Sequence, residues 1–131
     1  MKIDEKRIAF EIWDPADKEW FRQPPMSYYY KNTKGAIHVF SVTDRWTFEE
    51  VKKLIEQSKR HGEEGMQMIL VGNKCDDEEY REVSTEEAKE VAEMHDIPYI
   101  ETSAKCDINV NEMFEDVMLR IFRENENHRR K

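Results

Sequence analysis

The stretch Met68-Ile69-Leu70-Val71-Gly72-Asn73-Lys74-Cys75-Asp76 says most about the architecture of this 131-residue chain. Residues 68–71 are all apolar, which is typical of a central strand covered on both faces of a parallel sheet. The polar residues that follow stand where ligands bind in α/β proteins, beyond the carboxyl end of a strand. The stretch therefore predicts an α/β fold with Asn73, Lys74 and Asp76 at its binding edge.

Three other segments have the composition of strands, and helical patterns separate most of them. They are residues 7–13, 36–42 and 99–102, of which the first alternates apolar and polar residues. Strands that alternate with helices are typical of a mainly parallel sheet with helices on both faces. We therefore expect a three-layer α/β domain.

The helices have recognisable starts and apolar faces. Thr47 with Glu50 makes a capping box that predicts the start of one helix. The apolar face of that helix is predicted to contain Phe48, Val51, Leu54 and Ile55. A second box, Ser84 with Glu87, predicts the next helix, and an apolar stripe over residues 110–122 predicts the last. That stripe consists of Val110, Met113, Phe114, Val117, Ile121 and Phe122.

Length and composition limit the classes of protein. We expect a single domain over residues 1–124 and a polar tail over residues 125–131, with fraying from Glu124 onward. The 21 lysines and arginines against 29 aspartates and glutamates give a formal net charge of −8. Such a charge repels phosphate backbones and anionic lipid, so neither nucleic acid nor a membrane is expected as a partner. Two cysteines make no disulfide framework, and a cytoplasmic location is expected.

A second polar segment, Glu101-Thr102-Ser103-Ala104-Lys105, closes the fourth predicted strand. If the two strands are neighbours, both polar segments open on one edge of the sheet. An aspartate can accept two hydrogen bonds from adjacent ring N–H groups, and a lysine stem can cover an aromatic ring. This chemistry suits a guanine-like base. The alternative is that Asn73 and Asp76 form only a polar turn.

The order and spacing of five segments resemble the Ras-like small GTPases, and the Rab branch most closely. The segments are residues 13–22, 27–29, 42–44, 73–76 and 101–105. The resemblance implies a P-loop GTPase fold in which Asp76 reads the guanine edge, Asn73 ties loops together and Lys74 packs on the base. It also implies that the backbone N–H of Ala104, between Ser103 and Lys105, faces the guanine carbonyl oxygen.

The sequence also departs from that family. No G-x-x-x-x-G-K-[S/T] occurs, and the family's first strand, first helix and first switch have no counterpart, so a truncated domain is expected. Asp14 matches the magnesium-associated aspartate, but Asp17 replaces a glycine that meets the terminal phosphate. Lys18 replaces the glutamine that orients the attacking water, and lysine has no acceptor with which to do so. We therefore assign no catalytic or metal residue. GDP or GTP with Mg is expected only if the missing segment is supplied elsewhere.

In that family the missing strand lies between those matching residues 7–13 and 36–42. Its loss would leave a slot about 10 Å wide, because neighbouring strands lie ~4.8 Å apart. The two strands can pair directly in a rearranged sheet, a second copy can exchange a strand to make a homodimer, or the chain can stay partly unfolded. His38 and Ser41 are polar where an apolar strand is expected. Either the sequence is adapted to the loss of the missing strand, or these two side chains form hydrogen bonds with nearby groups.

Two hypotheses of function follow. The first is a degenerate GTP-binding domain with at most weak guanine recognition and no hydrolysis. The second is a non-enzymatic scaffold, engineered or naturally truncated, that binds no nucleotide and self-associates. By the resemblance, the aromatic residues of the switch-like region would contact a protein effector. The alternative is that these side chains pack in the core. These residues are Trp13, Trp20, Phe21, Tyr28, Tyr29 and Tyr30.

Overall fold

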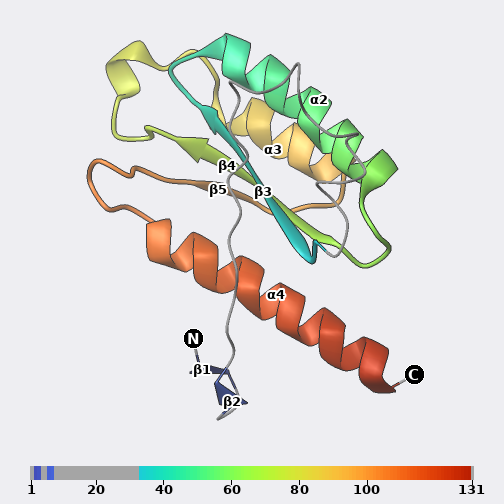
Figure 1. Cartoon of the computed structure of the whole chain (residues 1–131). Coiled ribbons are helices and arrows are strands. Elements are labelled where there is room, and N and C mark those ends of the chain that lie inside the picture. Colours follow the sequence, from blue (N-terminus) through green and yellow to red (C-terminus); the bar gives the residue numbers. More distant parts are fainter. Residues whose placement is uncertain (1, 4–5, 8–32, 131) are drawn as a thin grey trace, which may run out of the picture.

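The computed structural model describes residues 2–3, 6–7 and 33–130 (Figure 1). Two short strands, β1 (Lys2–Ile3) and β2 (Lys6–Arg7), form an antiparallel pair. A parallel three-stranded sheet has the order β3-β4-β5 and consists of β3 (Gly35–Ser41), β4 (Gln67–Asn73) and β5 (Tyr99–Glu101). Apart from Arg7, the strand predicted over residues 7–13 lies outside the described residues.

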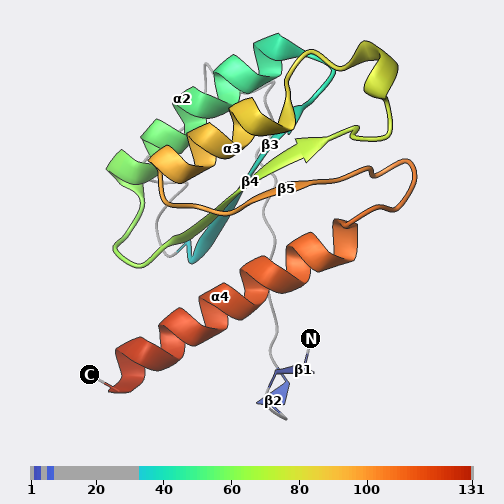
Figure 2. The same cartoon turned by 180° about the vertical axis from the view of Figure 1, so that it is seen from behind.

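Helices cover both faces of this sheet. Figures 1 and 2 show α2 (Arg45–His61) and α3 (Thr85–Met94) on one face and α4 (Val110–Arg130) on the other. A short 3-10 helix, η2 (Glu78–Tyr80), lies between β4 and α3. The described part of the chain therefore has the three-layer α/β architecture that the sequence predicts.

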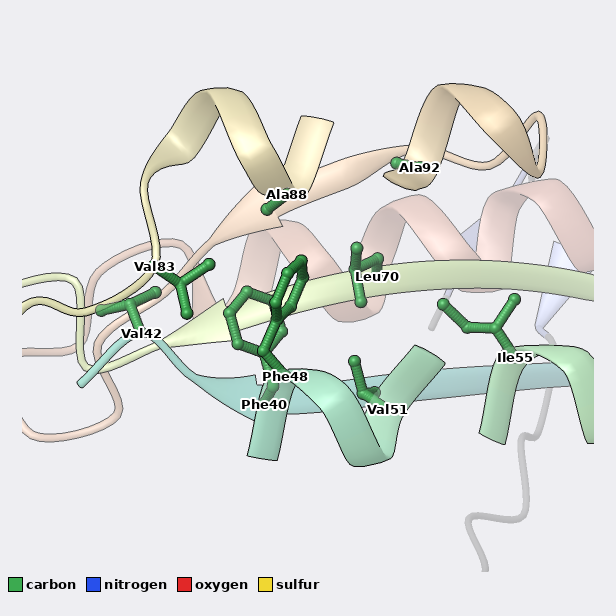
Figure 3. Close-up of a cluster of buried hydrophobic side chains, with 9 residues drawn as sticks. All are labelled: Phe40, Val42, Phe48, Val51, Ile55, Leu70, Val83, Ala88 and Ala92. Carbon is green, nitrogen blue, oxygen red and sulfur yellow. The ribbon is translucent and has the colours of Figure 1, made fainter. Parts of the chain in front are cut away.

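The apolar side chains form one cluster on each face of the sheet. Between the sheet and the α2–α3 layer lie Phe40, Val42, Phe48, Val51, Ile55, Leu70, Val83, Ala88 and Ala92 (Figure 3). The cluster on the α4 side contains Ile69, Val71, Met113 and Val117. Leu70 thus belongs to one cluster, while Ile69 and Val71 belong to the other. Strand β4 is therefore buried on both faces, as its unbroken apolar run predicts.

The start of α2 differs from the predicted capping box. The N-cap is Asp44, whose carboxylate accepts a hydrogen bond from the backbone N–H of Trp46 at 3.0 Å. The Thr47 hydroxyl instead donates to the carbonyl oxygen of Asp44 at 2.7 Å, and Glu50 pairs with Lys53 at 3.2 Å. The box at Thr47 is wrong because the cap is Asp44, three residues earlier, and the helix begins at Arg45. The second box is confirmed, since Ser84 and Glu87 make both reciprocal hydrogen bonds.

The buried face of α2 is also shifted from the predicted one. Leu54 is 43% exposed, whereas Ser58 is only 1% exposed. Positions 48, 51, 55 and 58 follow helical spacing toward the sheet, which leaves Leu54 at the side. The Oγ atom of Ser58 is hydrogen bonded to Nε2 of the buried His38 at 3.1 Å. His38 is therefore satisfied locally, as is Ser41, whose Oγ lies 2.8 Å from Oγ1 of Thr43.

Helix α4 packs its apolar stripe on the sheet. Met113, Val117 and Phe122 are buried, and Ile121 is partly buried in the α4-side cluster. The helix continues to Arg130, so the segment from Glu124 for which the sequence predicts fraying is helical. Within residues 2–3, 6–7 and 33–130, no helix has the length and apolar character needed to cross a membrane.

Candidate functional site

The two polar segments meet because β4 and β5 are parallel neighbours. Gly72 of β4 lies opposite Glu101 of β5, and the N–H of Thr102 donates to the carbonyl oxygen of Gly72 at 2.8 Å. The N–H of Cys75 then donates to the carbonyl oxygen of Thr102 at 3.0 Å. Both segments therefore leave the sheet at the same edge, at the carboxyl ends of the strands (Figure 1).

The Asn73 side chain ties the two loops together. Its Oδ1 atom accepts one hydrogen bond from the Thr102 hydroxyl at 3.1 Å and another from the backbone N–H of Ala104 at 3.2 Å. The backbone carbonyl oxygen of Asn73 accepts a hydrogen bond from the N–H of Val42 at 3.0 Å, and this bond also fixes the end of β3. One residue thus joins three strand ends, a role that the resemblance implies for this asparagine.

A tight turn follows Asn73 and presents the next side chains to solvent. Lys74 has a positive φ of 66°, and its carbonyl oxygen accepts from the N–H of Asp77 at 3.1 Å. The left-handed conformation costs a residue other than glycine roughly 1 kcal/mol, and such strain is frequent at binding sites. Lys74 and Asp76 are both exposed.

Asp76 faces the loop after β5. A hydrogen bond from the Ser103 side chain lowers the pKa of Asp76, and the positive charge of Lys105 acts in the same direction. Ser103 is fully buried, and its backbone exchanges two hydrogen bonds with Ile108, at 3.0 and 2.9 Å, that close the loop. Asp76 is therefore an ionised acceptor beside a loop that backbone hydrogen bonds close.

The Ala104 amide does not point freely toward a ligand. It donates to Asn73, whereas the resemblance implies that it faces a guanine carbonyl oxygen. Ala104 and Lys105 are exposed, so a base can still approach this side of the loop. A guanine oxygen would have to share the Ala104 N–H with Asn73 or replace Asn73 as its acceptor.

A polar cluster behind these loops was missed by the sequence reasoning. Arg81, Thr85 and Tyr99 all donate to the carboxylate of Glu101. Arg81 belongs to a charged stretch that resembles an ordinary solvent-facing loop. No signal in one sequence pairs it with a carboxylate twenty residues further along the chain.

The structure brings together all six residues predicted to bind guanine, namely Asn73, Lys74, Asp76, Ser103, Ala104 and Lys105, on the two adjacent loops. The switch-like residues Asp14, Asp17 and Lys18 lie outside the described residues, as does the aromatic cluster of that region. Their predicted roles stay predictions.

The arrangement of these loops agrees with comparisons of the whole sequence. A family model described as the Ras family matches residues 1–123. Ras-related protein RABA5e of Arabidopsis thaliana is 42% identical over 122 residues, which are 93% of this chain and 56% of that relative. Ras-related protein SEC4 of Candida albicans is 40% identical over 109 residues, 83% of this chain and 51% of the relative.

Ras-related protein Rab-13 of Rattus norvegicus is 38% identical over 114 residues, 87% of this chain and 56% of the relative. The chain spans about half the length of the curated relatives that it matches, with 51% of SEC4 and 56% of RABA5e covered. The family match extends over nearly all of the chain, including the loops around Asn73 and Ser103. The chain therefore belongs to the Ras-like small GTPase superfamily, in its Rab branch.

Proposed function

We propose that this chain recognises guanine bases weakly, does not hold the phosphates and does not hydrolyse GTP. The observation that carries the proposal is the pair of hydrogen bonds that Asn73 accepts. They hold the loop of residues 74–77, here called the Asp76 loop, beside the loop of residues 103–108, the Ser103 loop. The lowered pKa of Asp76 keeps its carboxylate ionised for two ring N–H donors. Lys74 and Lys105 are exposed on the same loops, where their stems can cover the faces of a purine.

The phosphate side of the site argues against tight binding and turnover. The 131 residues contain no G-x-x-x-x-G-K-[S/T], the motif whose backbone N–H groups surround the phosphates. Asp17 and Lys18 replace the glycine and glutamine that family members use at the terminal phosphate. Phosphoryl transfer needs bound phosphates, a metal and a positioned water together. We infer that this chain supplies none of the three completely.

Magnitudes set the expected affinity. A charge-assisted hydrogen bond contributes about 1.5 to 3 kcal/mol, whereas association costs about 4 to 15 kcal/mol. Base contacts alone therefore leave a binding free energy on the order of 4 kcal/mol or less, which corresponds to millimolar affinity or weaker. The Ala104 N–H already donates to Asn73. A guanine oxygen that replaces Asn73 as acceptor therefore gains one hydrogen bond at the loss of another, which reduces the free energy of binding further.

A titration with guanosine tests base recognition, with adenosine as the comparison. We expect millimolar guanosine to shift the backbone amide NMR signals of residues 73–76 and 103–105, and adenosine to shift none of them. Asp76→Asn should abolish the shifts. The adjacent Asp77→Asn is the control because Asp77 caps η2 without a side-chain hydrogen bond. Absence of guanosine shifts in the unaltered chain, or phosphate release from GTP above a buffer control, would contradict the proposal.

A second candidate function, self-association, is favoured by the side chain of Val39. It is 52% exposed on the face of β3 opposite to the one that buries His38 and Phe40. Among the described residues, β3 has a strand partner on one side only, which is β4. A second copy that adds a strand at this edge would pair with the N–H and C=O groups of β3 that have no strand partner among the described residues. Light scattering across concentrations tests this, since a monomer at every concentration would exclude a dimer.

A further inference from the structure

The carboxylate of Glu101 is the centre of a polar cluster directly behind the two loops. Its Oε2 atom accepts hydrogen bonds from the Tyr99 hydroxyl at 2.7 Å, from the Thr85 hydroxyl at 2.9 Å and from the Arg81 guanidinium. Only 21% of the Glu101 side chain is exposed. Burial by itself raises the pKa of Glu101, but these three donors outweigh it and lower the pKa below its ordinary value. The carboxylate is therefore ionised in a largely buried position.

Arg81 connects this carboxylate to the segment that follows the Asp76 loop. Its side chain is 12% exposed, and its Nε–H donates to the carbonyl oxygen of Val83 at 2.8 Å. Another guanidinium N–H donates to Glu78 of η2 at 2.9 Å. The chain between β4 and α3 is thus fixed to β5 at a point two residues before Ser103.

Glu101 also holds the far end of the Ser103 loop. Its carbonyl oxygen accepts from the side-chain amide of Asn109 at 2.9 Å. Asn109 adopts a positive φ of 59° and directly follows Ile108, which closes the loop by its paired hydrogen bonds with Ser103. Through its side chain Glu101 therefore contacts the segment that follows the Asp76 loop, and through its backbone it contacts the end of the Ser103 loop.

We propose that Glu101, held by Arg81, Thr85 and Tyr99, is the positioning residue that sets the separation of the Asp76 and Ser103 loops. The inference rests on the proposed guanine recognition, because it assigns the residue that prepares this site. A binding site needs such support, since side chains on loops keep a working geometry only when neighbouring contacts fix the loops. Glu101 itself does not contact the base.

A merely structural ion pair makes a different prediction. Loss of the pair would then lower the free energy of unfolding and leave the loops unchanged in the folded molecules. A positioning role requires the loops to change while the fold persists. The hydrogen bond from Ala104 to Asn73 distinguishes the two, because it joins the loops without including any atom of the Glu101 cluster.

The test uses Glu101→Gln, which keeps the size and planar shape of the side chain but removes its charge. Asp116→Asn is the matched control, because Asp116 pairs with Arg120 at 3.0 Å on the exposed surface of α4. The readout is the exchange of the Ala104 amide with water, measured by NMR magnetisation transfer on the full chain without nucleotide. Because Ala104 lies in an exposed loop, we expect its amide to exchange by local opening and not by global unfolding.

We expect Glu101→Gln to accelerate the Ala104 exchange about tenfold and to abolish the guanosine-induced shifts, and Asp116→Asn to change neither. Tyr99→Phe removes only one donor and should act in the same direction with a smaller effect, which keeps the test valid if Glu101→Gln unfolds. Unchanged Ala104 exchange with retained guanosine shifts would overturn the positioning role. Accelerated exchange in a chain that never responds to guanosine would uphold loop positioning and overturn the proposed function.

Discussion

His38 and Ser58 form a buried pair between β3 and α2, with Nε2 of the imidazole 3.1 Å from Oγ of the hydroxyl. His38 is 6% exposed and Ser58 is 1% exposed. Burial, with a smaller contribution from the nearby His95, lowers the pKa of His38 to about 4. The imidazole is therefore neutral in the folded protein throughout the neutral range, while the unfolded chain titrates near the ordinary value.

This pair predicts a loss of stability in mild acid. Between about pH 6.5 and about pH 4 the unfolded chain binds a proton at His38 that the folded protein does not. The free energy of unfolding should therefore decrease as the pH falls through this window. From about pH 7.5 to about pH 5 the decrease due to His38 is roughly 2 kcal/mol, measured by urea unfolding.

His38→Gln is the comparison that isolates this contribution. Other charged groups lie close by, since His95 contacts Lys59 at 3.1 Å and Glu56 at 3.5 Å. These groups remain in the variant, so the difference between the two pH profiles reports His38 together with its coupling to His95. Parallel profiles for the variant and the original chain would show that His38 is not held neutral.

Gly72→Ala should destabilise the protein by about 1 to 3 kcal/mol through overpacking. A Cβ atom at Gly72 would collide with the Tyr99 hydroxyl and would lie 3.0 Å from Val42 and 3.1 Å from Phe40. Gly35→Ala is the milder comparison, because its closest obstacle is the mobile end of Ile121 at 2.6 Å. Chemical unfolding measures both.

A double-variant cycle tests the cause of that loss. In the Tyr99→Phe background the closest obstacle is gone, so Gly72→Ala should cost less than in the original chain. Equal costs in the two backgrounds would mean that Tyr99 is not the residue that requires glycine at position 72.

The observed N-cap of α2 predicts unequal effects of two acidic residues. Asp44→Ala should cost about 1 kcal/mol, because it removes the side-chain acceptor for the N–H of Trp46. Glu50→Ala should cost only a few tenths of a kcal/mol, because Glu50 makes a surface pair with Lys53. Thermal unfolding measures the loss of stability in both variants. A larger loss for Glu50→Ala than for Asp44→Ala would contradict the cap at Asp44 and support the capping box predicted at Thr47.

Much of the fold could be predicted because hydrophobic patterning specifies it locally. The apolar run at residues 68–71 identified the central strand, which the structure extends to Gln67–Asn73. The start and the buried face of α2 differ from the prediction, because Asp44 and Thr47 are both good caps and Leu54 lies at the margin of the apolar stripe. Packing against the sheet buries Ser58, and a short window of sequence does not specify such packing. Asp44 is the cap because the helix begins at Arg45.

The sequence likewise predicts one part of the candidate site and not the other. Asn73 ends β4, and Asp76 and Ser103 lie within three residues of the ends of β4 and β5, so their meeting could be predicted from parallel neighbouring strands alone. The Arg81–Glu101 pair could not be predicted, because it depends on how the segment between β4 and α3 folds back onto β5. The bond from Ala104 to Asn73 likewise depends on a separation of two loops that the sequence does not specify.

The most direct test of the central claim compares guanosine with GDP in the presence of Mg, by NMR titration of the same protein. If the chain recognises only the base, both ligands should bind with millimolar dissociation constants that agree within about threefold. The diphosphate would then add nothing, and the signals of residues 73–76 and 103–105 would shift alike for both. GDP binding about a hundredfold tighter than guanosine would contradict the account, because it would require this chain to hold the phosphates.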